Sequence, residues 1–213
     1  MKESLEKSFG NQILDISISL LKNLDNGKEK FCLDIIGNLI VYECVVIEQI
    51  INFQLFFKII CERVDNLNCS RYLWILSLIL IKLDMIDIEM NIILIKKIIN
   101  IFLYPKDYSI GIEVIFALSN YLLSNDPFSL FDLKVWDQVI HHAFTNLEHK
   151  ICFVAHEVYG LLTIINVILM KSKIEIDDFE KNQFKEILNK IYFDIKSEKE
   201  IESLIKNILN QLN

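Results

Sequence analysis

The chain has 213 residues, 53% of them apolar and 24% charged, and its formal net charge is −7. This apolar content is enough to build a folded core and excludes a disordered chain, and the acidic balance argues against a protein that binds nucleic acid through its phosphates. Five glycines and two prolines supply few of the turns that an all-β protein needs, so we expect an all-α protein.

Neither a membrane span nor a secretion signal is expected. The most apolar run, residues 72–83, is shorter than the roughly 20 residues of a spanning helix and is interrupted by Lys82. The amino-terminal residues mix both charges and lack the apolar core of a signal peptide. The five cysteines form no CxxC pair and are interpreted as reduced core residues. These observations predict a protein of the cytoplasm, the nucleus or both.

Apolar residues at helical spacing predict helices that follow one another in pairs. Residues 1–9 are polar and are interpreted as a frayed turn, and residues 12–22 form a first helix that Asn26 and Gly27 end. A second helix at residues 29–41 completes the first pair. Three further pairs are expected at residues 53–64 with 69–81, 92–104 with 109–123, and 136–146 with 149–165. The buried stripe is expected to include Leu20, Ile36, Ile60, Leu76, Ile99, Phe102, Leu118, Val139, Phe144 and Val158.

The connections between these helices agree with the predicted helix pairs. Pro105 falls in the turn within the third pair and Pro127 in the connection to the fourth, where a missing amide donor does no harm. Residues 43–50 and 85–90 fit the short first helix of a three-helix armadillo unit, with a two-helix HEAT unit as the alternative. Charged and apolar residues then alternate to the end of the chain, which predicts a C-terminal capping helical hairpin over residues 171–213.

A short pattern recurs through the pairs at nearly constant spacing. Its anchor residues lie 40, 42 and 41 residues apart, the spacing of armadillo and HEAT repeats: Asn38, Leu78, Asn120 and Leu161. A small residue directly precedes each anchor: Gly37, Ser77, Ser119 and Gly160. The pattern predicts a right-handed armadillo- or HEAT-like superhelix, an α-solenoid. We expect one helical-repeat domain over residues 1–213, with about four units up to residue 170.

One face of this superhelix carries the candidate site. The last helix of each unit lines the concave side, and residues four apart on it point the same way. The row presents Asp34, Asn38, Trp74, Phe116, Asn120 and Glu157. In one interpretation these residues pack the core and satisfy helix ends. In the other they line a groove, where Asn side chains bond to the backbone of an extended peptide, aromatic rings hold its Lys or Arg stems, and carboxylates attract their charge.

The sequence shows no complete catalytic or metal-binding constellation. His141 and His142 are adjacent, so they lie on different helix faces and suit a metal poorly. His149, Cys152 and His156 could share one helix face, but no second cluster completes a zinc shell. No glycine-rich phosphate loop occurs. We therefore expect no enzyme activity, no cofactor and no metal, and a metal-dependent enzyme built around His149 is the weakest alternative.

The run from residue 36 to about residue 167 resembles the armadillo region of importin-α, the nuclear-import adaptor. The recurring third helix of that family reads approximately W-A-L-S-N-I, with Trp and Asn four apart. Four segments match it in part: FALSNYL with Phe116 and Asn120, LWILSLI with Trp74 and Leu78, DIIGNLI with Asp34 and Asn38, and EVYGLLT with neither ladder residue. The resemblance implies an adaptor that carries protein cargo by a basic peptide segment.

The sequence thus predicts a non-catalytic, protein-binding adaptor with a groove for an extended basic peptide. The alternative is a helical-repeat scaffold or a subunit of a larger assembly, whose exposed apolar surface is covered by neighbours. The partner is expected to be a protein or a basic peptide and not a nucleic acid. Lys2 and Lys7 stand where the resembling family has an Arg-rich segment, which argues against binding of importin-β.

Overall fold

The computed structural model describes residues 2–23, 26–42, 53–64, 69–80, 88–149, 154–172, 174–195 and 198–213. The regular structure within these ranges is helical, which confirms the all-α prediction. Residue contacts divide the chain into two compact units, Met1–Asn120 (unit 1) and Tyr121–Asn213 (unit 2).

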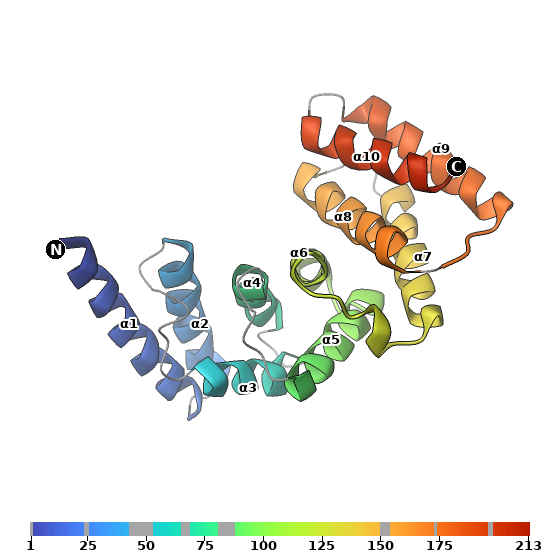
Figure 1. Ribbon diagram of the computed structural model, residues 1–213. Coiled ribbons are helices and arrows are strands. Elements are labelled where there is room, and N and C mark those ends of the chain that lie inside the picture. Colours follow the sequence, from blue (N-terminus) through green and yellow to red (C-terminus); the bar gives the residue numbers. More distant parts are fainter. Residues whose placement is uncertain are drawn as a thin grey trace. The chain divides into compact units, whose positions relative to one another are not determined.

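Unit 1 contains α1 (Lys2–Leu21), α2 (Asn26–Val41), α3 (Phe53–Arg63), α4 (Cys69–Ile79), α5 (Ile88–Leu103) and most of α6 (Tyr108–Ser124). α1 pairs with α2 and α3 with α4, and equivalent helices of neighbouring pairs also pack together: α1 with α3, α2 with α4, and α3 with α5. Figure 1 shows α2, α4 and α6 following one another in one row, with α3 and α5 in another. The helices α1 to α4 therefore pack both within a pair and against the equivalent helix of the neighbouring pair, as in a helical-repeat solenoid.

Unit 2 begins with the last turn of α6 and a short 3-10 helix, η3 (Phe128–Leu130). Four helices follow: α7 (Leu133–His149), α8 (Ala155–Lys171), α9 (Asp178–Asp194) and α10 (Lys199–Gln211). α7 pairs with α8 and α9 with α10, while α8 also contacts α10 and α7 contacts α9. The segment predicted as a C-terminal hairpin is α9 and α10, which repeat the pairing found in unit 1.

Two aspartates set the starts of α6 and α9. Asp107 Oδ1 accepts a hydrogen bond from the Ile110 amide at 2.9 Å, and this bond, followed by that of the Ser109 hydroxyl, lowers the pKa of Asp107. Asp177 Oδ1 accepts a hydrogen bond from the Glu180 amide at 2.8 Å. Both carboxylates satisfy amide groups that the first turn of a helix leaves open.

The helix boundaries differ from the prediction in several places, and α8, for example, continues to Lys171. α1 begins at Lys2, so the polar stretch predicted as a frayed turn is helical. Asn26 begins α2 and does not end the first helix, in keeping with the preference of Asn for helix starts. α7 continues to His149, which the spacing assigns to the following helix, and α8 begins only at Ala155. The two prolines lie in connections between helices, as predicted.

Of the two segments predicted as short first helices, residues 43–50 and 85–87 lie outside the described residues, and residues 88–90 belong to α5. Every predicted core residue except Leu20 is buried. Leu20 is 50% exposed, so its assignment to the core is wrong. α1 buries Leu14 and Leu21, and Leu20 is rotated from Leu21 by about 100°, which takes it out of the buried stripe.

Candidate functional site

Five of the predicted site residues lie on the row of α2, α4 and α6 in unit 1: Asp34, Asn38, Trp74, Phe116 and Asn120. The side chains of two of them form hydrogen bonds to neighbouring helices. Arg71 Nε of α4 donates a hydrogen bond to Asp34 Oδ1 of α2 at 2.8 Å. Asn120 Nδ2 of α6 donates a hydrogen bond to the backbone oxygen of Ser77 in α4 at 2.7 Å. This carboxylate and this amide therefore link successive helices of the row.

The small residues that precede the anchors serve the packing of the same row. A Cβ atom at Gly37 would lie 2.1 Å from Trp74 Cζ3, so the indole of α4 occupies the space that a side chain on α2 would fill. Ser77 and Ser119 are buried, and their hydroxyls donate to the backbone oxygens of Trp74 and Phe116, respectively. At Gly37 the absence of a side chain lets α4 approach α2 closely. Trp74 is half-buried and packs against α2, and this contact does not test whether it also binds a peptide.

The remaining predicted site residues differ in their exposure. Asn38 is exposed and Phe116 is half-buried. Glu157 lies in the first turn of α8, in unit 2, and is 2% exposed, so its carboxylate is not at the surface. Peptide binding by these side chains stays a prediction, since their positions alone do not test it.

A buried polar cluster that the sequence patterns missed joins α1, α2, α3 and α4. Glu29 is fully buried, and its Oε1 accepts hydrogen bonds from Arg63 Nη1 at 2.5 Å and from the Tyr72 hydroxyl at 2.7 Å. Arg63 also donates to the backbone oxygens of Leu21 and Lys22, carbonyls that the end of α1 leaves open. Burial and then the bond to Glu29 raise the pKa of Tyr72. The signal in the sequence is a carboxylate at helical spacing from the apolar residues of α2.

The other side of α2 carries an exposed row that we name the α2 stripe: Phe31, Ile35, Asn38 and Tyr42. Phe31, Ile35 and Tyr42 are 66%, 44% and 74% exposed. The Tyr42 amide still donates to the Asn38 backbone oxygen, so the helical turn extends to the end of the stripe. Two residues turn a helix by about 200°, and the stripe, which starts two residues after Glu29, therefore faces away from the buried cluster.

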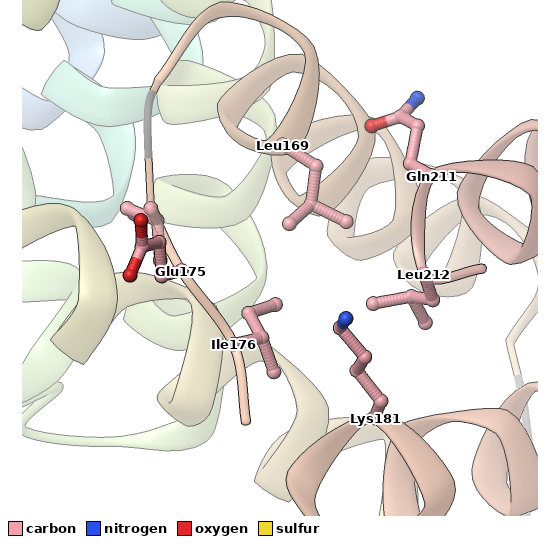
Figure 2. A pocket seen from close by; sticks show the side chains of 7 residues that line it. Leu169, Glu175, Ile176, Lys181, Gln211 and Leu212 are labelled. Carbon is pink, nitrogen blue, oxygen red and sulfur yellow. The ribbon is translucent and has the colours of Figure 1, made fainter. Parts of the chain in front are cut away.

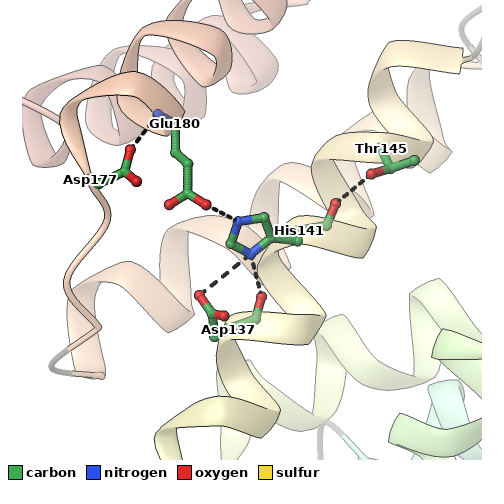
Figure 3. Close-up of polar contacts among 5 residues, drawn as sticks. All are labelled: Asp137, His141, Thr145, Asp177 and Glu180. Atoms are coloured by element: carbon green, nitrogen blue, oxygen red, sulfur yellow. Dashed lines mark hydrogen bonds and ion pairs between the residues drawn. The ribbon is translucent and has the colours of Figure 1, made fainter.

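In unit 2, His141 links α7 to α9 (Figure 3). Its Nδ1 lies 2.8 Å from the Asp137 backbone oxygen, and its Nε2 lies 2.9 Å from Glu180 Oε1. Both oxygens are acceptors, so both ring nitrogens must carry protons and the imidazole is charged when both bonds form. Burial lowers the pKa of His141, but the bonds to Asp137 and Glu180 outweigh burial and raise it. Beside this link, the rings of Phe144 and Phe184 stack with centroids 3.7 Å apart.

Raising the pH from about 5.5 to about 8 is expected to weaken the packing of α9 on α7. The folded-state pKa of His141 lies above its unfolded value, so its stabilisation is complete below the unfolded pKa and is lost as the pH rises through the folded one. Over this pH range the unfolding free energy of the wild-type protein should fall more than that of His141→Gln. The difference between the two decreases should not exceed about 1 kcal/mol, because the ring is partly exposed. A constant difference between the two proteins across this pH range would contradict a charged imidazole.

A pocket in unit 2 and the predicted histidine and cysteine cluster are two further candidates for a site. Figure 2 shows a pocket of about 410 Å³ in unit 2, lined by Leu169, Ile174, Glu175, Ile176, Lys181, Gln211 and Leu212. Its ionisable lining side chains are Glu175 and Lys181, and Lys181 Nζ lies 3.8 Å from Asp178 Oδ1. Within the described ranges, no group of three His, Cys, Asp or Glu side chains could hold a metal ion. His149 and His156 are exposed, and Cys152 lies outside those ranges. None of the described helices has the length and apolarity to cross a membrane.

Comparison with known proteins identifies a fold and no family. No protein-family model and no curated protein matches the chain. The crystal structure of an engineered protein, Northeast Structural Genomics Consortium Target OR329, has a TM-score of 0.59 and 11% identity, over 93% of this chain and 78% of that one. A second engineered protein, Target OR497, has a TM-score of 0.56 and 10% identity, over 93% of this chain and 47% of that one.

At these identities the likeness concerns the fold alone. It agrees with the packing of the described helices, which associate in successive pairs as in a helical-repeat solenoid. The predicted solenoid is therefore confirmed. The comparisons identify no importin-α relative, so membership of that family is not supported.

Proposed function

We propose that the protein is a non-catalytic helical-repeat scaffold that holds a protein partner on the row of α2, α4 and α6. The observation that carries this proposal is the α2 stripe, in which Phe31 and Ile35 are exposed on a helix whose opposite side is packed. A contiguous exposed row of large apolar side chains is typical of a protein interface. The repeat architecture holds such a row on a rigid frame, because each helix is fixed by its neighbours.

The same surface supports an importin-like adaptor less well. A basic peptide would depend on carboxylates and amides of the row, but Asp34 is paired with Arg71 and the Asn120 amide already donates to Ser77. A peptide at these positions would first have to break bonds between helices. Phe31 and Ile35 have no polar side-chain atoms, so a partner can contact them without breaking a hydrogen bond, which favours a scaffold over an adaptor for nuclear-import cargo.

Replacing Phe31 and Ile35 together by Ser is expected to release the partner and leave the fold intact. Both side chains are exposed, so the substitutions should change the unfolding free energy by less than about 1 kcal/mol. Wild-type and variant protein would be compared by cross-linking in the source cell, with identification of the captured proteins. Phe179→Ser is the matched control, because Phe179 is 70% exposed on α9 in unit 2.

A protein captured by wild type and by the control, and reduced at least about tenfold by the double variant, would support the scaffold. Identical capture by all three proteins would overturn it. Transport receptors and basic-tailed cargo captured independently of the stripe would favour the adaptor instead.

A further inference from the structure

We propose that the α2 stripe binds an amphipathic helix of a partner protein, with acidic residues beside the apolar row of that helix. This inference rests on the scaffold function proposed above and adds the chemistry of the partner. The stripe advances by four, three and four residues from Phe31 to Tyr42. This is the spacing of a seam between two helices that pack knobs into holes at a shallow crossing angle.

The geometry of the stripe favours a helix over an extended peptide. An extended peptide is commonly held through its backbone, as when it adds a strand to a sheet edge. A helix has no free sheet edge, and the Asn120 amide of the same row is engaged with Ser77. Within the α2 stripe, Asn38 is the one polar position, flanked by Ile35 and Tyr42. An amide at one position of an apolar seam fixes the register of the bound helix, which should place a polar side chain opposite.

The charges of α2 point to an acidic partner. Its two carboxylates, Glu29 and Asp34, are each paired with an arginine of a neighbouring helix. Its two lysines, Lys28 and Lys30, are exposed. Although the whole chain carries a net charge of −7, the charge that α2 presents to solvent is therefore positive.

The positive charge lies at one end of the stripe. Lys28 stands three residues before Phe31, in line with the stripe and in the first turn of α2. The positive end of the helix dipole lies at the same place and adds to the field of the lysines. We expect the acidic residues of the partner helix to lie against this first turn.

A second copy of this chain is a poorer occupant of the stripe. Bound through its own α2, it would bring two more exposed lysines, while its carboxylates on that helix are already paired with arginines. It would supply the apolar row without the complementary charge. A partner of different sequence with Glu or Asp beside its apolar row satisfies both requirements.

The test uses two synthetic helical peptides of about three heptads, at concentrations where each is monomeric. Both carry Leu along one row with a single central Asn; one has Glu beside the row and the other has Lys. Binding to the full-length protein is measured by fluorescence anisotropy at low and high salt. We expect the Glu peptide to bind about tenfold tighter than the Lys peptide at low salt, with a smaller difference at high salt.

Variants separate this inference from non-specific attraction. The double change Lys28→Glu and Lys30→Glu should reverse the preference between the peptides. The double change Phe31→Ser and Ile35→Ser should abolish the binding of both peptides. The control Phe179→Ser should leave the binding of both peptides unchanged. Equal binding of both peptides, a preference for the Lys peptide, or a preference that survives the charge reversal would overturn the inference. Self-association of the wild type that Phe31→Ser removes would also overturn it, because the occupant would be a second copy.

The outcome for the scaffold function is read separately, from the cross-linking experiment. If the peptides fail and cross-linking to a natural partner still depends on Phe31, the partner chemistry is wrong and the scaffold function stands. If cross-linking is independent of Phe31 as well, both proposals fall.

Discussion

Replacing Arg63 by Met is expected to lower the unfolding free energy of unit 1 by about 3–5 kcal/mol, as found when one partner of a buried ion pair is removed. Glu29 is fully buried and would lose its charged partner while it keeps the hydrogen bond from Tyr72. The carbonyls of Leu21 and Lys22 at the end of α1 would lose their donor at the same time. Urea unfolding followed by circular dichroism would measure the loss.

Two further variants show whether the buried carboxylate causes this loss. Glu29→Gln combined with Arg63→Met should cost clearly less than Arg63→Met alone, because no unpaired charge is then buried. Lys58→Met is the surface control. Lys58 Nζ lies 4.0 Å from Glu62 Oε1, and the two side chains are 65% and 60% exposed. Removal of this exposed ion pair should lower the unfolding free energy by less than about 1 kcal/mol. Equal losses for Arg63→Met and Lys58→Met would mean that the cluster does not hold the helices together.

Replacing Gly37 by Ala is expected to destabilise the protein by about 1–3 kcal/mol, although Ala normally stabilises a helix interior relative to Gly. The new Cβ would lie 2.1 Å from Trp74 Cζ3 and 2.4 Å from Cη2, so the indole or the whole of α4 must move. Thermal unfolding would show the loss as a lower melting temperature.

Gly111 supplies the matched control for Gly37. It lies inside α6, and the atom nearest to a Cβ there is Pro105 Cβ at 3.8 Å, an ordinary contact. Gly111→Ala should therefore stabilise the protein by up to about 1 kcal/mol. The cost of Gly37→Ala should shrink in a Trp74→Leu background, since a smaller side chain leaves room for the methyl group. A stabilising effect of Gly37→Ala in the wild-type background would contradict the close packing of α2 and α4.

The architecture was predictable because its signals are local. Helical spacing of apolar residues depends on neighbours within one or two turns, so the helix pairs and buried positions such as Ile60, Leu76 and Val139 follow from the sequence without knowledge of the fold. The connections at Pro105 and Pro127 are equally local. The errors occur at helix ends and at Leu20, where the boundary of a buried stripe depends on which neighbouring helix covers it.

The positions of the anchor row were also predictable, but their partners were not. The pattern places Asp34, Trp74 and Asn120 on one face at repeat spacing, and a peptide was one plausible partner for them. In the folded chain they meet Arg71, Gly37 and the Ser77 carbonyl of neighbouring helices. Such contacts join residues about forty positions apart, and the composition of a single helix carries no information about them.

The helix α2 shows most clearly where local information ends. Its sequence carries two rows at helical spacing, one that begins at Glu29 and includes the predicted core residue Ile36, and one that begins at Phe31. The first row is buried although it contains a carboxylate, because Leu33 and Ile36 carry its apolar face. Arg63 and Tyr72 arrive from α3 and α4 with donors that offset the burial of Glu29, and the sequence of α2 alone carries no information about these partners.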